Sequence, residues 1–193
     1  MNYLISQLRI SLVATIVLAI ILCGLYPALI WGVAQALFPE KANGSLIIQN
    51  GRTVGSKLIG QNFTDSKYFH PRPSAAGDGG YDATSSGGSN LGPISKKLID
   101  SVKERVEAYR AENNLPLNVQ APADAVTASA SGLDPHITVR NALLQVPRVA
   151  KARGIEEKTV VEKIEANTQG RDFYILGEPR VNVLALNLSL DAR

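Results

Sequence analysis

The run LVATIVLAIILCGLYPALIWGVAQALF, from Leu12 to Phe38, contains no charged residue. Arg9 is the last charge before it and Glu40 is the first charge after it. A helix needs roughly 20 apolar residues to cross the hydrocarbon core of a bilayer, so this run is long enough to span one with some tilt. The sequence therefore predicts an N-terminal tail at 1–9, a transmembrane helix at 10–39 and a single domain at 40–193.

The rival interpretation of the apolar run is a cleaved signal peptide. Ala34-Gln35-Ala36 does have the small-x-small pattern of a cleavage site. However, the apolar region of a signal peptide is typically about 7–15 residues long, and this run is much longer. The pattern favours an anchor that is retained.

Small residues recur every four positions within the run. They are Gly24, Ala28, Gly32 and Ala36. Small residues on one helix face allow a neighbouring membrane helix to approach closely, so this stripe predicts packing against a partner helix. The alternative is chance, because glycine and alanine are common in membrane helices. Pro27 lies beside the stripe and predicts a kink.

The charges of the chain lie almost entirely after the apolar run. Of the 20 Lys and Arg only Arg9 precedes residue 40, and all 17 Asp and Glu follow it. This near balance gives little support to nucleic-acid binding, which usually requires a clustered basic face. The charges also do not decide on which side of the membrane the domain lies, because a long domain is translocated largely regardless of its charge. The single cysteine, Cys23, excludes a disulfide within the chain and a Cys-ligated zinc site.

Two segments of the domain have the patterns of strands. Asn50-Gly51 between apolar runs predicts a β-hairpin over residues 45–59, because a type I′ turn needs a positive φ at both central residues. Near the C-terminus, Leu184, Leu186, Leu188 and Leu190 alternate with small or polar residues, as in a half-buried strand. The preceding valines are out of phase with them and indicate a bulge near Val183.

Helical spacing predicts several helices between those strands. We expect one beginning at Pro93 and ending at Asn113, a short one within 121–131, one capped by Thr138, interrupted by Pro147 and ended by Gly154, and one over 156–167. The fold class is therefore α+β. The basic residues Arg140, Arg148 and Lys151 are expected on a solvated helix face.

The sequence contains no catalytic or metal-binding motif. There is no G-x-S-x-G, no serine with a lysine three residues later and no paired-histidine spacing, and His70 and His136 are far apart.

The Gly-rich loop Ser86-Gly87-Gly88-Ser89-Asn90 precedes a predicted helix. Its backbone N–H groups could hold an anion, or the loop could be a rigid docking element.

The composition of the segment from Tyr68 to Asn90 does not suit the hydrophobic core of a domain, so we expect the segment to lie outside it. It combines aromatic residues and an arginine with glycines and prolines, and aromatics and arginine are enriched at the centres of interfaces. We predict that it docks on a partner subunit. A mobile, solvent-exposed loop is the alternative. The docking residues would be Tyr68, Phe69, Arg72 and Tyr81.

The chain contains several distinct motifs in a recognisable order. They are Gly55-Ser-Lys-Leu-Ile-Gly-Gln61, Tyr68-Phe-His-Pro-Arg-Pro-Ser74, Ser86-Gly-Gly-Ser-Asn-Leu-Gly-Pro93, Ala128-Ser-Ala-Ser-Gly-Leu-Asp-Pro-His136, the run from Gln145 to Gly154, and Val181-Asn-Val-Leu184. Together they resemble the KdpC family, the C subunit of the bacterial Kdp potassium-importing ATPase. The resemblance covers essentially the whole chain.

The resemblance implies a non-catalytic subunit in the bacterial inner membrane, with its soluble domain in the periplasm. The implied partners are the channel-like subunit KdpA, the P-type ATPase subunit KdpB and the small subunit KdpF. The family is described as a catalytic chaperone that raises the affinity of the ATPase subunit for ATP. The resemblance also implies a possible nucleotide signature at Ser86–Asn90, although a periplasmic loop cannot touch cytoplasmic ATP. We therefore expect no cofactor of the chain's own, with ATP only as a family attribution.

Two other functions remain open on the residues alone. A membrane-anchored periplasmic enzyme would need a catalytic constellation that the sequence does not display. A free-standing binding module would not need the stripe of small residues in its membrane helix.

Overall fold

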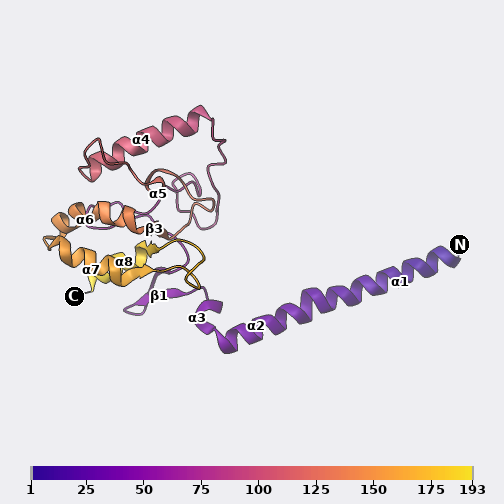
Figure 1. The fold of residues 1–193 in the computed structure, drawn as a ribbon. Coiled ribbons are helices and arrows are strands. Elements are labelled where there is room, and N and C mark those ends of the chain that lie inside the picture. The colour runs from indigo at the N-terminus through magenta and orange to yellow at the C-terminus, as the bar shows by residue number, and fades with distance from the viewer. Residues whose placement is uncertain (1, 193) are drawn as a thin grey trace. The chain divides into compact units, whose positions relative to one another are not determined.

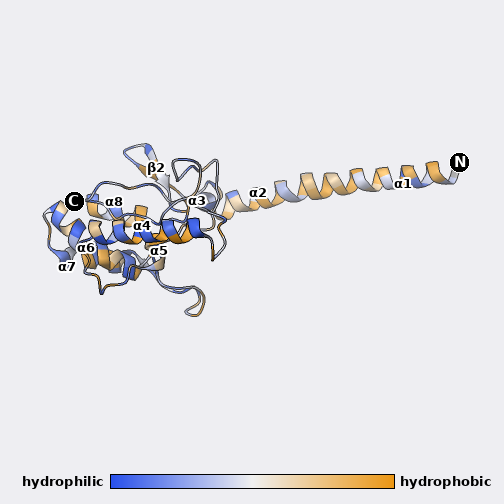
Figure 2. Ribbon diagram, turned by 90° about the horizontal axis from the view of Figure 1, so that it is seen from above, coloured by the Kyte–Doolittle hydropathy of each residue, from blue (hydrophilic) through white to orange (hydrophobic). Residues whose placement is uncertain are grey.

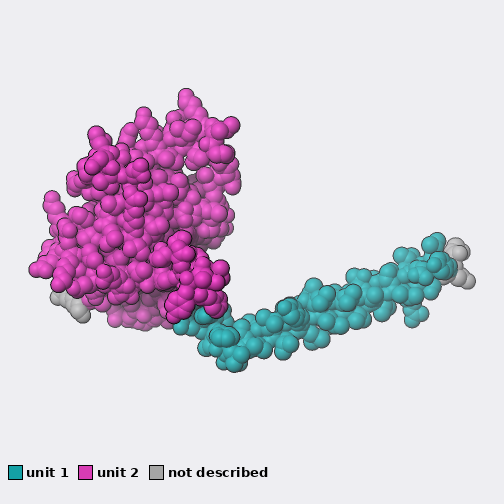
Figure 3. Space-filling view, in the orientation of Figure 1, with its two compact units in different colours: residues 1–46 teal, residues 47–193 magenta. Residues whose placement is uncertain are grey.

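A computed structural model gives the fold of the chain and describes residues 2–192. The chain divides into two compact units, residues 1–46 and 47–193 (Figure 3). The division falls at the first strand of the hairpin, a few residues beyond the end of the predicted membrane helix. Each unit is described by itself.

The first unit is mainly one long helical rod (Figure 1). It consists of α1 (Asn2–Ala19), the π-helical segment η1 (Ile20–Leu25) and α2 (Tyr26–Leu37), and the short helix α3 (Pro39–Ala42) follows. Pro27 explains the π-helical segment, because a proline ring clashes with the carbonyl four residues earlier in a regular α-helix. The wider turn is visible in the N–H of Tyr26, which donates to the carbonyl of Ile21, five residues back.

The hairpin predicted around Asn50-Gly51 is confirmed. Strands β1 (Leu46–Gln49) and β2 (Arg52–Ser56) pair in a two-stranded sheet. Asn50 and Gly51 both have positive φ, 50° and 74°, as the expected turn requires.

The second unit builds its core on a small antiparallel sheet in the order β3-β5-β4. These strands are His136–Thr138, Arg180–Asn182 and Thr168–Gln169. Ile137 and Thr168 both lie opposite Val181 of the central strand. The helices α6 (Val139–Arg153), α7 (Glu157–Asn167) and α8 (Val183–Asp191) pack together beside the sheet, with α7 in contact with both others (Figure 1). The buried residues of this core are Phe69, Ile137, Ala142, Val146, Val149, Ala150, Val160, Ile164, Val181, Val183 and Leu186.

Local signals set the ends of most helices. Thr138 caps α6 by accepting a hydrogen bond from the N–H of Asn141 at 3.1 Å, and Gly154 ends the helix in the left-handed conformation. The helix α4 (Lys96–Glu112) begins after Ser95, later than predicted, and ends at Asn113 as predicted. A short helix, α5 (Ala123–Val126), lies where one was expected and packs against α4.

The predicted interruption at Pro147 is wrong. Helix α6 continues through it to Arg153. Val146 and Val149 on either side of the proline are buried in the core, and their packing holds the helix together despite the lost backbone hydrogen bond.

The predicted C-terminal strand is also wrong beyond Asn182. The chain leaves β5 and enters α8, which Asn182 caps by accepting a hydrogen bond from the N–H of Ala185 at 3.0 Å. The buried residues of α8 are Val183, Leu184, Leu186 and Asn187, which follow helical spacing and do not alternate as in a strand. The apparent bulge near Val183 is the junction between strand and helix.

Candidate functional site

Most residues of the long helix of the first unit are hydrophobic, as the colours of Figure 2 show, and its large apolar side chains are exposed. The helical segment Tyr3–Leu37 has a mean hydropathy of 2.5 in its most apolar part, and none of that part is buried within the described chain. Trp31, for example, is 67% exposed. A surface of this kind is unfavourable in water, whereas its length and composition fit a membrane span.

The four small residues of this helix lie in open space. All are exposed, and a Cβ atom added at Gly24 or Gly32 would meet no described atom within 4 Å. Ala28, Gly32 and Ala36 belong to α2, where residues four apart share a face. Gly24 belongs to η1, whose wider turn shifts it relative to the other three. Packing of these positions against a partner helix stays a prediction.

In the second unit, two buried amides hold the backbone at residues 69 and 70. The Asn187 side chain of α8 accepts from the N–H of Phe69 at 2.8 Å and donates to its carbonyl at 3.0 Å. The Gln145 side chain of α6 does the same for His70, at 2.8 and 3.1 Å. The segment thus makes the hydrogen bonds of a strand, with side-chain amides in place of a neighbouring strand.

Arg148 of α6 is a second buried anchor for the same segment. Its guanidinium donates to the carbonyls of Ser66 and Tyr68 at 2.7 and 2.9 Å, and to the side chains of Asn113 and Gln145 at 3.0 and 2.7 Å. Burial lowers the pKa of Arg148. The expectation that Arg148 lies on a solvated face is therefore wrong.

His70 and Glu112 form a close ion pair, with 2.6 Å between Nδ1 and the nearer carboxylate oxygen. The hydrogen bond from His70 lowers the pKa of Glu112, and the charge of Arg148, 3.8 Å away, acts in the same direction. This pair links the irregular segment to the end of α4.

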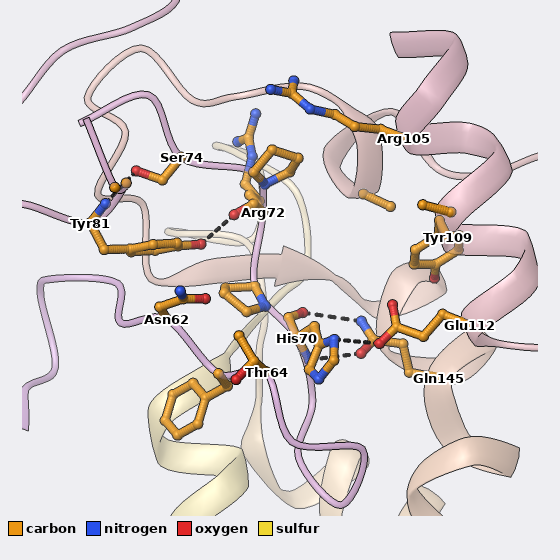
Figure 4. Close-up of a pocket in the computed structure, with 17 residues that line it drawn as sticks. Asn62, Thr64, His70, Arg72, Ser74, Tyr81, Arg105, Tyr109, Glu112 and Gln145 are labelled. Atoms are coloured by element: carbon orange, nitrogen blue, oxygen red, sulfur yellow. Dashed lines mark hydrogen bonds and ion pairs between the residues drawn. The ribbon is translucent and has the colours of Figure 1, made fainter. Parts of the chain in front are cut away.

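A pocket of about 410 Å³ opens between the irregular segment of residues 62–81 and α4 (Figure 4). His70, Glu112 and Gln145 meet at one end of it, as the dashed lines in Figure 4 show. The Ser74 hydroxyl, also on its lining, donates to the carbonyl of Gly132 at 2.7 Å and accepts from the N–H groups of Ala76 and Tyr81. Each of these polar groups has partners within the domain, which is the arrangement of structural residues.

A second ion pair involves Arg72, which also lines the pocket. Arg72 contacts the Asp134 carboxylate at 2.9 Å, and His136 lies 3.4 Å from its other oxygen. Burial alone would raise the pKa of Asp134, but the hydrogen bonds from His136 and Arg72 outweigh it and lower the pKa to about 2. The Tyr81 hydroxyl donates to the carbonyl of Arg72, and burial raises the pKa of Tyr81.

Comparison of the sequence with known proteins places the chain in a family. The family model described as "K+-transporting ATPase, c chain" (KdpC) matches residues 8–192. A potassium-transporting ATPase KdpC subunit of Nitratidesulfovibrio vulgaris is 54% identical over 98% of the chain and 95% of its own length. That of Mycobacterium tuberculosis strain H37Rv is 54% identical over 97% of both chains, and that of Koribacter versatilis is 52% identical over 96% of this chain and 94% of its own.

The chain belongs to the KdpC family. It is accordingly a membrane subunit of a potassium-transporting ATPase, with one candidate membrane helix near its N-terminus.

The four residues that were expected to dock on a partner of this KdpC chain lie in different environments in the structure. Phe69 is fully buried in the core, so its assignment to a docking surface is wrong. Arg72 and Tyr81 are partly buried and bonded to the domain itself. Tyr68 is partly exposed, donates to Asp191 at 3.0 Å and lies beneath Lys67 and Arg153. Docking through the remaining exposed parts of this segment stays a prediction.

The Gly-rich loop of the KdpC resemblance, Ser86–Asn90, packs against the chain near Ser131. The N–H of Gly87 donates to the carbonyl of Ser131 at 2.9 Å, and the Ser86 hydroxyl donates to the same carbonyl at 3.0 Å. A Cβ at Gly88 would lie 3.0 Å from the carbonyl oxygen of Ala130. Helix α4 begins only at Lys96, so the loop does not sit at its N-terminus. Close backbone approach therefore explains the glycine at position 88, whereas a Cβ atom at Gly87 would meet no described atom within 4 Å.

The sequence patterns did not predict the structural role of three buried polar residues of this KdpC chain. Gln145, Arg148 and Asn187 are polar residues on the apolar faces of α6 and α8. The signal that could have found them is a polar residue at a position where helical spacing demands an apolar one. For Asn187 that signal was hidden because its segment was assigned to a strand.

Proposed function

We propose that the chain is a non-catalytic accessory and assembly subunit of a high-affinity, ATP-driven potassium importer. The observation that carries the proposal is the family match over residues 8–192, joined to a helix whose most apolar part is not buried by any of the residues that the structure describes. A helix of this kind, with an open stripe at Ala28, Gly32 and Ala36, suits packing against the membrane helices of larger subunits.

The proposed partners are a channel-like potassium-selecting subunit (KdpA), a P-type ATPase subunit (KdpB) and a small subunit (KdpF), within the bacterial inner membrane. The soluble domain lies on the periplasmic side, or outside the cell. The role of the chain is to stabilise or couple the channel-like and ATP-hydrolysing subunits.

The chemistry of the second unit supports a non-catalytic role. Its buried polar residues, among them Gln145, Arg148 and Asn187, hold backbone segments in place. The Ser74 hydroxyl is engaged with three backbone groups. Among residues 2–192 no group of three His, Cys, Asp or Glu side chains could hold a metal ion. A side chain that acts as a scaffold is not free to act as a nucleophile or base.

Any effect of the chain on the affinity of the ATPase subunit for ATP is proposed to be a coupling between distant sites. The loop Ser86–Asn90 gives little support to direct nucleotide binding, because the N–H of Gly87 is already bonded to Ser131. Titration of the full chain in detergent with ATP tests this. We expect no saturable binding at micromolar ATP. Micromolar binding that is abolished by Gly88→Val would contradict the proposal.

Copurification tests the assembly role. A tagged full chain, expressed with the other genes of its complex and extracted in mild detergent, should retain large polytopic subunits. A matched control replaces residues 10–39 by an unrelated membrane helix, which keeps the anchor and removes the stripe. Recovery of the parent chain alone would overturn the proposal and favour an anchored enzyme or a free-standing binding module.

A further inference from the structure

A short loop between β4 and β5 displays four consecutive apolar side chains. Phe173 is 85% exposed, Tyr174 95%, Ile175 74% and Leu176 57%. We name this group, Phe173–Leu176, the apolar tip. A contiguous exposed apolar patch of this kind usually marks an interaction site, whereas single exposed apolar residues are ordinary.

The base of the loop is held rigidly. The N–H of Asp172 donates to the carbonyl of Leu176 at 2.8 Å, and the N–H of Leu176 donates back to Asp172 at 2.9 Å. Arg171 contacts both carboxylate oxygens of Glu178, at 2.8 and 2.7 Å. Arg180 contacts Asp172 at 3.3 Å. These contacts hold the two ends of the loop together, which restricts the conformations of the tip and reduces the entropy lost on binding.

The backbone of the tip is strained. Phe173 and Tyr174 have φ of 52° and 65°, in the left-handed region that residues with a large side chain avoid. Strained positions of this sort concentrate at binding sites, where the conformation serves recognition. Here the strain turns two aromatic side chains outward, and the loop gains no core contact from them.

The charges around the tip favour a protein pocket over a lipid surface. Arg171 pairs with Glu178 and Arg180 pairs with Asp172, so the base is neutral overall. Binding to an anionic membrane surface relies on an excess of Lys and Arg, which this base lacks. A narrow protrusion with two aromatic side chains instead has the form of an interface anchor that fills a pocket.

The size of the tip indicates that it acts together with the membrane helix. Phe and Tyr each offer about 150–250 Å² of surface, whereas a stable interface buries about 800 Å² on each partner. The tip supplies a substantial part of that area and not all of it. A second attachment through the helix would raise the effective concentration of the tip at its pocket.

We propose that the apolar tip is a preformed anchor that inserts into an uncharged, apolar pocket on a partner subunit of the complex, outside the bilayer. This inference rests on the proposed function for the existence of that partner. It identifies a surface different from the segment Tyr68–Asn90.

Photo-crosslinking in the intact complex tests the contact. Tyr174 of the full chain is replaced by p-benzoylphenylalanine, and the matched control carries the same residue at the exposed position Lys158 of α7. We expect a covalent product with a partner subunit at Tyr174, in about tenfold higher yield than at Lys158. A product with lipid alone, or equal yields at both positions, would overturn the inference.

Substitution tests the contribution of the tip to assembly. The double variant Phe173→Ser, Tyr174→Ser should lose partner subunits from detergent about tenfold faster than the parent. The control Leu117→Ser removes an isolated side chain that is 87% exposed and should behave as the parent does. If the parent retains its partners and the double variant retains them equally, the inference is wrong. If the parent itself retains none, the proposed function is wrong instead.

Discussion

At the scale of single residues, Gly132 lies where no side chain fits. Its φ is +68°, and an added Cβ would lie 2.7 Å from both the N of Ala76 and the carbonyl oxygen of Gly87. We expect Gly132→Ala to lower the free energy of unfolding by about 1–3 kcal/mol. Thermal melting of the full chain in detergent, followed by circular dichroism, measures this. Gly92→Ala, which meets no described atom within 4 Å, is the control, and equal melting temperatures for the two variants would contradict the account.

The carboxyl group of Asp134 should make stability depend on pH. Its pKa is lowered to about 2, so its contribution is present above its ordinary pKa and is lost as the pH falls toward 2. We expect Asp134→Asn to reduce the free energy of unfolding by about 2 kcal/mol at neutral pH, and the difference from the parent to shrink between pH 5 and pH 2. Denaturant unfolding at a series of pH values measures it. A difference from the parent that does not change with pH would argue against the ion pair, and Asp100→Asn, at an exposed position, is the control variant.

The residues that the sequence predicted correctly are those whose role is local. Asn50-Gly51 forms the turn, and Thr138 and Gly154 end α6, because each acts within a few residues of itself. Phe69 and Arg148 were misassigned because their environments come from distant parts of the chain. Phe69 is held by Asn187, and Arg148 reaches the carbonyls of Ser66 and Tyr68. Composition alone does not reveal such partners.

At the scale of elements, α8 shows where periodicity becomes ambiguous. In the run 184–190 a leucine occupies every second position, which suits a strand, but positions 183, 186 and 190 also share a helix face. The cap at Asn182 and the packing of α8 against α7 settle the choice in favour of the helix. Short apolar runs of this kind are decided by tertiary contacts.

The membrane helix offers a prediction at the same scale. We expect Gly32→Leu to reduce recovery of partner subunits from detergent about tenfold, because the larger side chain keeps a neighbouring helix away. The chain by itself has open space at Gly32, so the melting temperature of the soluble domain should not change. The control Val33→Leu enlarges the adjacent position on a different face. Recovery of Gly32→Leu equal to that of Val33→Leu would remove the stripe from the interface.

At the scale of the whole molecule, the chain is a subunit of a potassium-transporting ATPase, and its proposed role is to assemble and couple the other subunits without catalysing a reaction itself. Its long helix has an uncovered apolar surface, and its domain fixes an irregular segment with buried polar side chains. Both features suit the proposed role, in which the chain acts through its contacts with other subunits. The exposed apolar tip at Phe173–Leu176 is proposed to add a preformed contact with a partner subunit.

The most direct test is the potassium-stimulated ATP hydrolysis of the complex, reconstituted in lipid vesicles with and without this chain. The account predicts that omitting the chain lowers this activity about tenfold, that adding the chain back restores it, and that the chain alone hydrolyses no ATP. Full potassium-stimulated activity without the chain, or ATP hydrolysis by the purified chain alone, would contradict it.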